Sequence, residues 1–210
     1  MSWCLGVLVV AFAVDPVEST IAGLQKRYAA VKAVSAEFRQ VYRAPGIEQV
    51  ESGTLVMKKP GLMRWEYRAP ERKLFVADGR NTYLYTPEDR QVLVRSLSAA
   101  EIRSTPLQFL LGQGDILKSF TAEPETEFRP RSEGSVMLRL KPRASQPDYA
   151  FLVLECGRKS YDLRRIIIRE LSGNTSEFDL SNLSTEVKVD NKQFQFKIPK
   201  GVEVVQLDEK

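Results

Sequence analysis

The residues with the clearest chemical potential are large apolar side chains spaced two apart in the stretch from Lys58 to Pro70. Met63, Trp65 and Tyr67 alternate there with charged residues. Such alternation is typical of a β-strand with one covered face and one wet face. Three large side chains on one face predict either a thick core or a cavity that binds an apolar ligand.

Residues for catalysis are scarce by comparison. The chain has no histidine, which removes the usual general base and the commonest metal ligand. Cys156 lies in an apolar run, so we expect a buried small side chain rather than a reactive thiol. No spacing singles out an Asp/Glu pair or a Ser-Lys pair. We therefore expect a protein without enzymatic activity, with no catalytic residue, metal site or cofactor.

Length and composition indicate an ordinary globular chain that can form one substantial domain or two small ones. The 210 residues are 43% hydrophobic and 28% charged, and the net charge is +4 with both signs interspersed. No Lys/Arg cluster with interleaved aromatic residues is present, so we expect no nucleic-acid partner.

The first residues predict export. Residues 5–13 are apolar and end in Ala11-Phe12-Ala13, an A-x-A cleavage pattern, although Met1-Ser2-Trp3 lacks the basic residues of a usual signal peptide. We predict a signal peptide over 1–13 and a single mature domain over 14–210. A buried N-terminal helix or strand is the alternative. No other apolar run approaches the length of a membrane span.

Asp15-Pro16 predicts the start of a helix of about four turns. Its apolar residues recur three and four apart, as one buried stripe requires. The stripe consists of Val17, Ile21, Leu24, Tyr28 and Val31.

Alternating segments from Ser35 to Arg95 predict a meander of antiparallel strands, since the intervening loops are short and hold no long helix. Residues 96–120 differ, and Thr105-Pro106 opens a short, almost wholly apolar helix there. Further strands follow, including 177–189 and 194–199. The predicted fold is mostly β (α+β), an unclosed antiparallel β-barrel of about ten to eleven strands, with an N-terminal helix and a helical lid over the concave face.

Several motifs, in order, resemble one known family. They are Phe38-Arg39-Gln40, Gly53 to Trp65 with its K-P-x-x-x-x-W core, Val76 to Gly79, Tyr83 to Pro87, Thr105-Pro106, and Phe194 through Val202. In this order and spacing the chain resembles the LolA family, the periplasmic carriers of outer-membrane lipoproteins. The resemblance runs from about Thr20 to the C-terminus.

The resemblance implies that lipoprotein acyl chains lie between the sheet and the lid. The expected cavity residues are Tyr28, Phe38, Leu55, Met57, Met63, Trp65, Tyr67, Phe75, Tyr83 and Tyr85. The expected lid residues are Pro106, Leu107, Phe109, Leu110 and Leu111. Lys59 stands where well-known members have an arginine that holds the lid shut, and a lysine lacks the planar donor fork of arginine.

The resemblance also implies partners and a compartment. We expect a monomer in the periplasm of a Gram-negative bacterium that receives acylated lipoproteins from an inner-membrane ABC transporter and delivers them to an outer-membrane acceptor lipoprotein. Two alternatives stay open. One is a module for another envelope lipid, in a polyketide- or glycolipid-export pathway, and the other is a sensor or regulator domain that reads lipids or peptide segments. Plain core packing is the alternative for each cavity residue.

Overall fold

The computed structural model describes residues 16–96, 115–147 and 149–207. These residues form one twelve-stranded sheet in the order β12-β6-β5-β4-β3-β2-β1-β11-β10-β9-β8-β7. The strands are β1 (Ala33–Ala44), β2 (Ile47–Lys58), β3 (Leu62–Ala69), β4 (Lys73–Ala77), β5 (Asn81–Thr86), β6 (Gln91–Ser96), β7 (Phe120–Pro124), β8 (Ser135–Pro142), β9 (Phe151–Gly157), β10 (Leu163–Arg169), β11 (Thr175–Ser184) and β12 (Glu203–Gln206).

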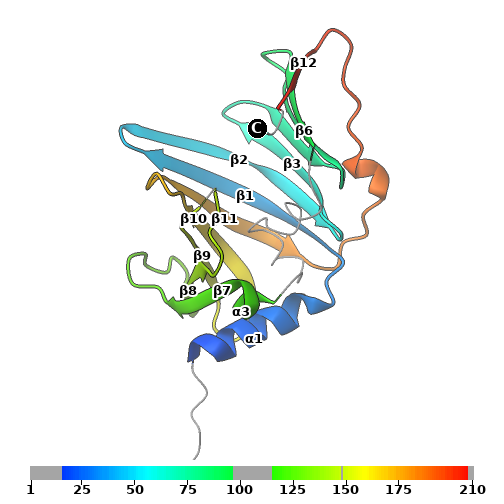
Figure 1. Ribbon diagram of the computed structural model, residues 1–210. Helices are drawn as coiled ribbons and strands as arrows, with labels where there is room; N and C mark the ends of the chain where they lie inside the picture. Colours follow the sequence, from blue (N-terminus) through cyan, green and yellow to red (C-terminus); the bar gives the residue numbers. More distant parts are fainter. Residues whose placement is uncertain (1–15, 97–114, 148, 208–210) are drawn as a thin grey trace, which may run out of the picture.

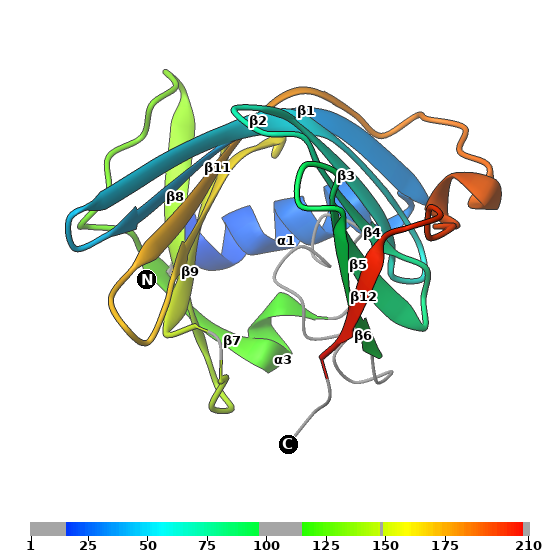
Figure 2. The ribbon, with the colours of Figure 1, turned by 90° about the horizontal axis from the view of Figure 1, so that it is seen from above.

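The sheet curls into an arch whose edge strands β7 and β12 do not pair (Figure 2). This confirms the predicted unclosed barrel. Two details of the prediction are wrong. The sheet has twelve strands rather than ten or eleven, because short edge strands lie at both sides, and it is not wholly antiparallel, because β12 pairs with β6 in parallel. Among the described helices, none is long and apolar enough to cross a membrane.

Helix α1 (Pro16–Ala29) lies across the concave side of the sheet at one end of the strands (Figures 1 and 2). Its buried residues confirm the predicted apolar stripe up to Tyr28, and Val31 is also buried just beyond the helix. The Tyr28 hydroxyl accepts a hydrogen bond of 3.0 Å from the Leu163 amide. Burial raises the pKa of Tyr28, so this phenol stays neutral and holds the helix against the sheet.

One large hydrophobic core lies on the concave side, where α1 packs against the sheet. It includes Ile21 and Leu24 from the helix and Leu154 and Ile166 from the sheet. Cys156 belongs to it and is fully buried, and burial raises the pKa of its thiol to about 11. Burial therefore favours the protonated thiol, and the predicted burial of this side chain is confirmed.

The opposite, convex face carries a buried ion pair. The Arg165 guanidinium lies 2.7 Å from the Glu155 carboxylate, and both side chains are almost fully buried. The backbone amides of Arg131 and Ser132 each donate a 3.0 Å hydrogen bond to Glu155. The loop around residue 131 therefore covers this part of the convex face.

The C-terminal segment corrects one prediction. Residues 194–199 were expected to form a strand, but a 3₁₀ helix, η2 (Asn191–Phe194), stands at their start and no strand follows before β12. The segment runs over the outside of the sheet (Figure 2). Phe194 is buried and Phe196 half-buried, whereas Gln195 and Lys197 are exposed. The alternation therefore reflects packing of an extended segment against the sheet, without strand pairing. Likewise, β11 ends at Ser184 and not near 189.

The predicted helical insertion falls mainly on 97–114, outside the described residues. Its last part is a single turn, α3 (Ile116–Ser119), with Asp115 as N-cap. The Asp115 carboxylate accepts a 3.0 Å hydrogen bond from the Leu117 amide.

Candidate functional site

The centre of the concave face is built by the adjacent strands β1, β2 and β3. On β2 and β3, Leu55 pairs with Trp65 and Met57 pairs with Met63. Residues that pair directly share a face of the sheet, so these four side chains lie on one surface. Each is 5% exposed or less.

Aromatic rings extend this surface onto β1. The Phe38 ring lies 4.9 Å from that of Trp65 and 5.0 Å from that of Tyr67, measured between ring centroids. Trp65 also meets Phe178 of β11 edge-on at 5.6 Å. Tilted and edge-on contacts of this kind are favourable between aromatic rings, so the rings form one continuous apolar floor.

Eight of the ten predicted cavity residues therefore belong to one surface or pack against it. Phe75 on β4 pairs with Trp65 on β3 and is partly buried against the same hydrophobic cluster. Tyr28 belongs to this cluster from α1. The eight are Tyr28, Phe38, Leu55, Met57, Met63, Trp65, Tyr67 and Phe75.

Tyr83 and Tyr85 were placed on the wrong face by the sequence. Tyr83 pairs with Val76 and Tyr85 with Leu74, whereas Phe75 faces Leu84. Since neighbours along a strand alternate in face, both tyrosines lie opposite to Trp65. Their rings pack against Phe196 of the C-terminal segment at 5.3 and 5.7 Å. The alternation correctly grouped the two tyrosines, but within one strand it could not say which face was concave.

Lys59 lies at the end of the sheet that α1 covers. Its ammonium donates a 3.0 Å hydrogen bond to the carbonyl oxygen of Ala29, the last residue of α1. Partial burial lowers the pKa of Lys59. A cation at a helix C-terminus is favourable because the last carbonyl groups have no partner within the helix. The predicted lid residues Pro106, Leu107, Phe109, Leu110 and Leu111 lie outside the described residues.

The sequence prediction missed a polar cluster on the concave face. The Lys73 ammonium lies 2.6 Å from the Glu51 carboxylate, and the Tyr67 hydroxyl donates a 3.3 Å hydrogen bond to the Gln40 side chain. A signal was available, since Glu51 stands two and four residues before Gly53 and Leu55 on β2 and so shares their face. Among the described residues, no group of three or more acidic, cysteine or histidine side chains is placed to hold a metal ion.

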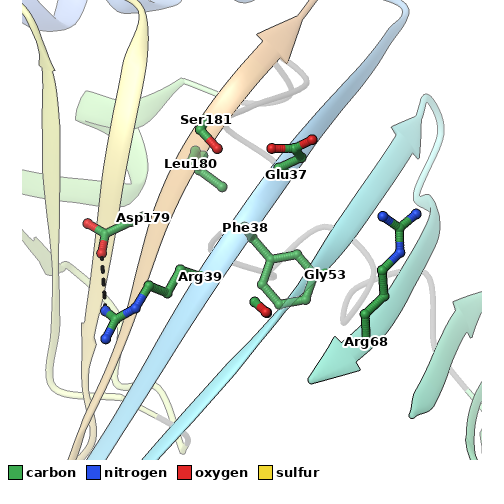
Figure 3. A pocket seen from close by; sticks show the side chains of 9 residues that line it. Glu37, Phe38, Arg39, Gly53, Arg68, Asp179, Leu180 and Ser181 are labelled. Atoms are coloured by element: carbon green, nitrogen blue, oxygen red, sulfur yellow. Dashed lines mark ion pairs between the residues drawn. The ribbon is translucent and has the colours of Figure 1, made fainter. Parts of the chain in front are cut away.

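The convex face carries an open groove of about 310 Å³ above Gly53 (Figure 3). Its charged side chains come from three strands, with Arg39 paired to Asp179 at 3.8 Å and Arg68 on the far side. Phe38 also lines it, although the Phe38 ring packs against Trp65 and Tyr67. The lining of the groove is mixed, because charged side chains stand beside Phe38 and Leu180, and it lacks the continuous aromatic and methionine surface of the concave face.

The fold and this surface define a class of protein: a curled, unclosed sheet with a helix across its concave side and an aromatic and methionine floor. The family model described as outer membrane lipoprotein carrier protein LolA matches residues 29–197, and the chain belongs to that family.

Individual relatives agree with this assignment. The chain is 32% identical over 181 residues to an outer-membrane lipoprotein carrier protein of Bordetella pertussis, covering 85% of this chain and 82% of the relative. It is 32% identical over 194 residues to one of Methylobacillus flagellatus, covering 91% and 89%. Among solved structures, an uncharacterized conserved protein from Thermus thermophilus aligns with a TM-score of 0.55 and 12% identity, over 90% of this chain and 98% of that one, a likeness of fold.

Proposed function

We propose that this protein is a periplasmic, non-enzymatic carrier that binds the acyl chains of lipoproteins and shuttles them from the inner to the outer membrane. The observation that carries the proposal is the continuous apolar floor of Phe38, Trp65 and Met63 in a chain of the LolA family. The named relatives are outer-membrane lipoprotein carrier proteins, which supports the same cargo here.

The composition of the floor suits a flexible ligand. Met57 and Met63 are unbranched and adaptable, so they can repack around acyl chains of different shape. Burial of an acyl chain stabilises a complex by about 0.8 kcal/mol per CH₂, so one C16 chain is worth roughly 12 kcal/mol. Complete burial of two or three such chains would approach or exceed the non-covalent affinity limit, and cargo would not be released. The carrier therefore has to bury its cargo incompletely.

Lid movement offsets part of that binding energy. In the proposal, residues 106–111 form a lid over the bound acyl chains. Lys59 holds this lid closed through a hydrogen bond worth about 1 kcal/mol. One ammonium proton of Lys59 is used for the Ala29 carbonyl, and two remain for the lid. The inner-membrane donor is an ABC transporter and the receiver an outer-membrane lipoprotein. Residues 1–13 serve as the export signal and 14–210 as the carrier domain.

Trp65 makes the proposal directly testable, since the chain has two tryptophans and Trp65 is the one after residue 13. A lipopeptide with brominated acyl chains quenches tryptophan fluorescence only on contact. We expect saturable quenching of Trp65 in the processed protein. The control is Trp65→Phe combined with Phe196→Trp, which moves the indole to the convex face. No quenching of Trp65, or equal quenching in the control, would contradict acyl-chain binding on the concave face.

A further inference from the structure

An ion pair lies beside the apolar floor. Lys73 is the first residue of β4 and Glu51 lies on β2, so the pair at 2.6 Å spans the strand β3 between them. The side chains are only 22% and 12% exposed. An ion pair on a protein surface contributes little to stability, and a partly buried pair also loses solvation free energy. Stability alone therefore does not explain why the Lys73–Glu51 pair lies beside an apolar surface.

The register places this pair on the concave face. Lys73 pairs directly with Tyr67, and Glu51 pairs directly with Gln40. Tyr67 and Gln40 are themselves joined by a hydrogen bond. The four side chains therefore form one polar cluster (Gln40, Glu51, Tyr67 and Lys73) on the surface that carries Phe38.

The polar cluster follows the apolar floor along β3. Met63, Trp65 and Tyr67 succeed one another on the concave face, and the Tyr67 ring touches Phe38, which touches Trp65. Lys59, just before β3, lies against the end of α1, so Tyr67 and Lys73 lie toward the opposite end of the strands. Figure 2 looks along the arch with α1 behind, so this opposite end faces the viewer. If an acyl chain lies along the apolar floor, the polar linkage that joins it to the peptide can reach the polar cluster.

The cluster has unused hydrogen-bonding capacity. Among the described residues, the Lys73 ammonium has Glu51 as its one partner, which leaves two of its three N–H donors. The second carboxylate oxygen of Glu51 has no hydrogen-bond donor in the same part of the chain. The site thus offers a donor and an acceptor side by side.

We infer, building on the proposed carrier function, that Lys73 and Glu51 bind the polar linkage between acyl chains and peptide and so select acylated peptides over other lipids. Lys73 donates to an amide or ester carbonyl oxygen, and Glu51 accepts from a peptide N–H or a free α-ammonium. A free fatty acid presents a carboxylate, and a phospholipid presents a phosphate. Lys73 attracts either anion, but Glu51 at 2.6 Å neutralises the Lys73 charge and repels the anion, so the pair gives these ligands no net electrostatic gain. The selected class is therefore an acyl chain joined to a peptide through a neutral linkage.

The test compares two ligands that share one acyl chain. Palmitate and an N-palmitoylated tripeptide amide are titrated against the purified protein and against Glu51→Gln, with calorimetry as the readout. The amide of glutamine keeps the shape but removes the charge. We expect Glu51→Gln to bind the lipopeptide about tenfold more weakly and palmitate more tightly, because one charged hydrogen bond and one repulsion are lost.

A matched control lies on the same sheet. Glu66→Gln removes an ion pair of similar length, 2.7 Å to Arg64, on the opposite face of β3, and it should leave the ratio of the two affinities unchanged. Lys73→Gln provides a second variant and should weaken lipopeptide binding about tenfold as well.

The outcomes separate this inference from the proposed function. If the unaltered protein binds the lipopeptide but Glu51→Gln and Lys73→Gln do not change the affinity ratio, the selective role is wrong and the carrier function stands. If the unaltered protein binds neither ligand, both are wrong. Equal weakening for both ligands in every variant would show loss of packing and would also overturn the inference.

Discussion

Phe38 and Tyr67 lie on strands that are not neighbours, yet their rings touch, with centroids 5.0 Å apart. Both pair with the same residue, Gly53 on the intervening strand β2. Glycine has no side chain to separate them, so the two rings close over it. The register of β2 and β3 shifts at this point, between Ser52 and Gly53. The glycine thus joins the apolar floor of β1 to that of β3.

Gly53 should tolerate no side chain. A Cβ atom added there would lie 1.9 Å from the carbonyl oxygen of Glu66, a backbone atom that cannot turn away. We expect Gly53→Ala to lower the free energy of unfolding by about 1–3 kcal/mol, as overpacking typically does. Urea denaturation measures this. Ser52→Ala is the control, expected to stay within about 0.5 kcal/mol of the unaltered protein. Equal stability of Gly53→Ala and the parent would refute the close approach.

The two faces of the sheet should differ in their effect on ligand binding. Trp65→Leu removes the central ring of the floor, and we expect lipopeptide affinity to fall at least tenfold, since about 1.4 kcal/mol of lost contact is enough. Tyr85→Leu removes a ring on the convex face and should leave affinity within twofold. Affinity is measured by calorimetry on samples with native circular dichroism. Equal losses in both variants would show that the face assignment does not govern binding.

Lys59 should stabilise the end of α1. We expect Lys59→Met to speed amide hydrogen exchange in the last turn of the helix by about fivefold, since one hydrogen bond of about 1 kcal/mol is lost. If Lys59 also holds residues 106–111, exchange in that segment rises too. Lys26→Met removes an exposed charge from the same turn and serves as control. Unchanged exchange in both regions together with unchanged lipopeptide affinity would show that Lys59 neither stabilises the end of α1 nor holds the lid.

The C-terminal segment should act as a structural cover of the convex face. Phe194 is 1% exposed, so we expect Phe194→Ala to cost about 3–5 kcal/mol of unfolding free energy. The Lys58 ammonium also donates a 2.7 Å hydrogen bond to the Asn191 side chain, at the start of this segment. Because the segment lies opposite to Trp65, folded Phe194→Ala protein should keep its lipopeptide affinity. A large loss of affinity at temperatures where the variant stays folded would assign the segment a part in binding.

The sequence was informative about elements and about one face of each strand. The stripe from Val17 to Tyr28 predicted α1, and the alternation of Met63, Trp65 and Tyr67 predicted β3 and its covered surface. These patterns depend only on residues close together in the sequence, so they can be recognised without knowledge of the tertiary fold.

The relation between strands was not accessible in the same way. Tyr83 and Tyr85 alternate as clearly as Met63 and Trp65, but the concave face is fixed only by pairing through β4. The segment around Phe196 alternates like a strand because one of its sides packs against the convex face of the sheet and the other faces solvent. It does so without strand pairing, which alternation alone does not reveal. The partnership of Glu51 with Lys73 spans 22 residues and depends on the same register.

The most direct test of the central claim is a release assay. Spheroplasts that synthesise a labelled outer-membrane lipoprotein are incubated with the processed protein, and the soluble fraction is examined by native mass spectrometry. We predict a soluble one-to-one complex of protein and acylated lipoprotein, which Trp65→Leu reduces and Tyr85→Leu does not. Lipoprotein that stays with the spheroplasts, while the unaltered protein remains empty or carries another lipid, would contradict the carrier function.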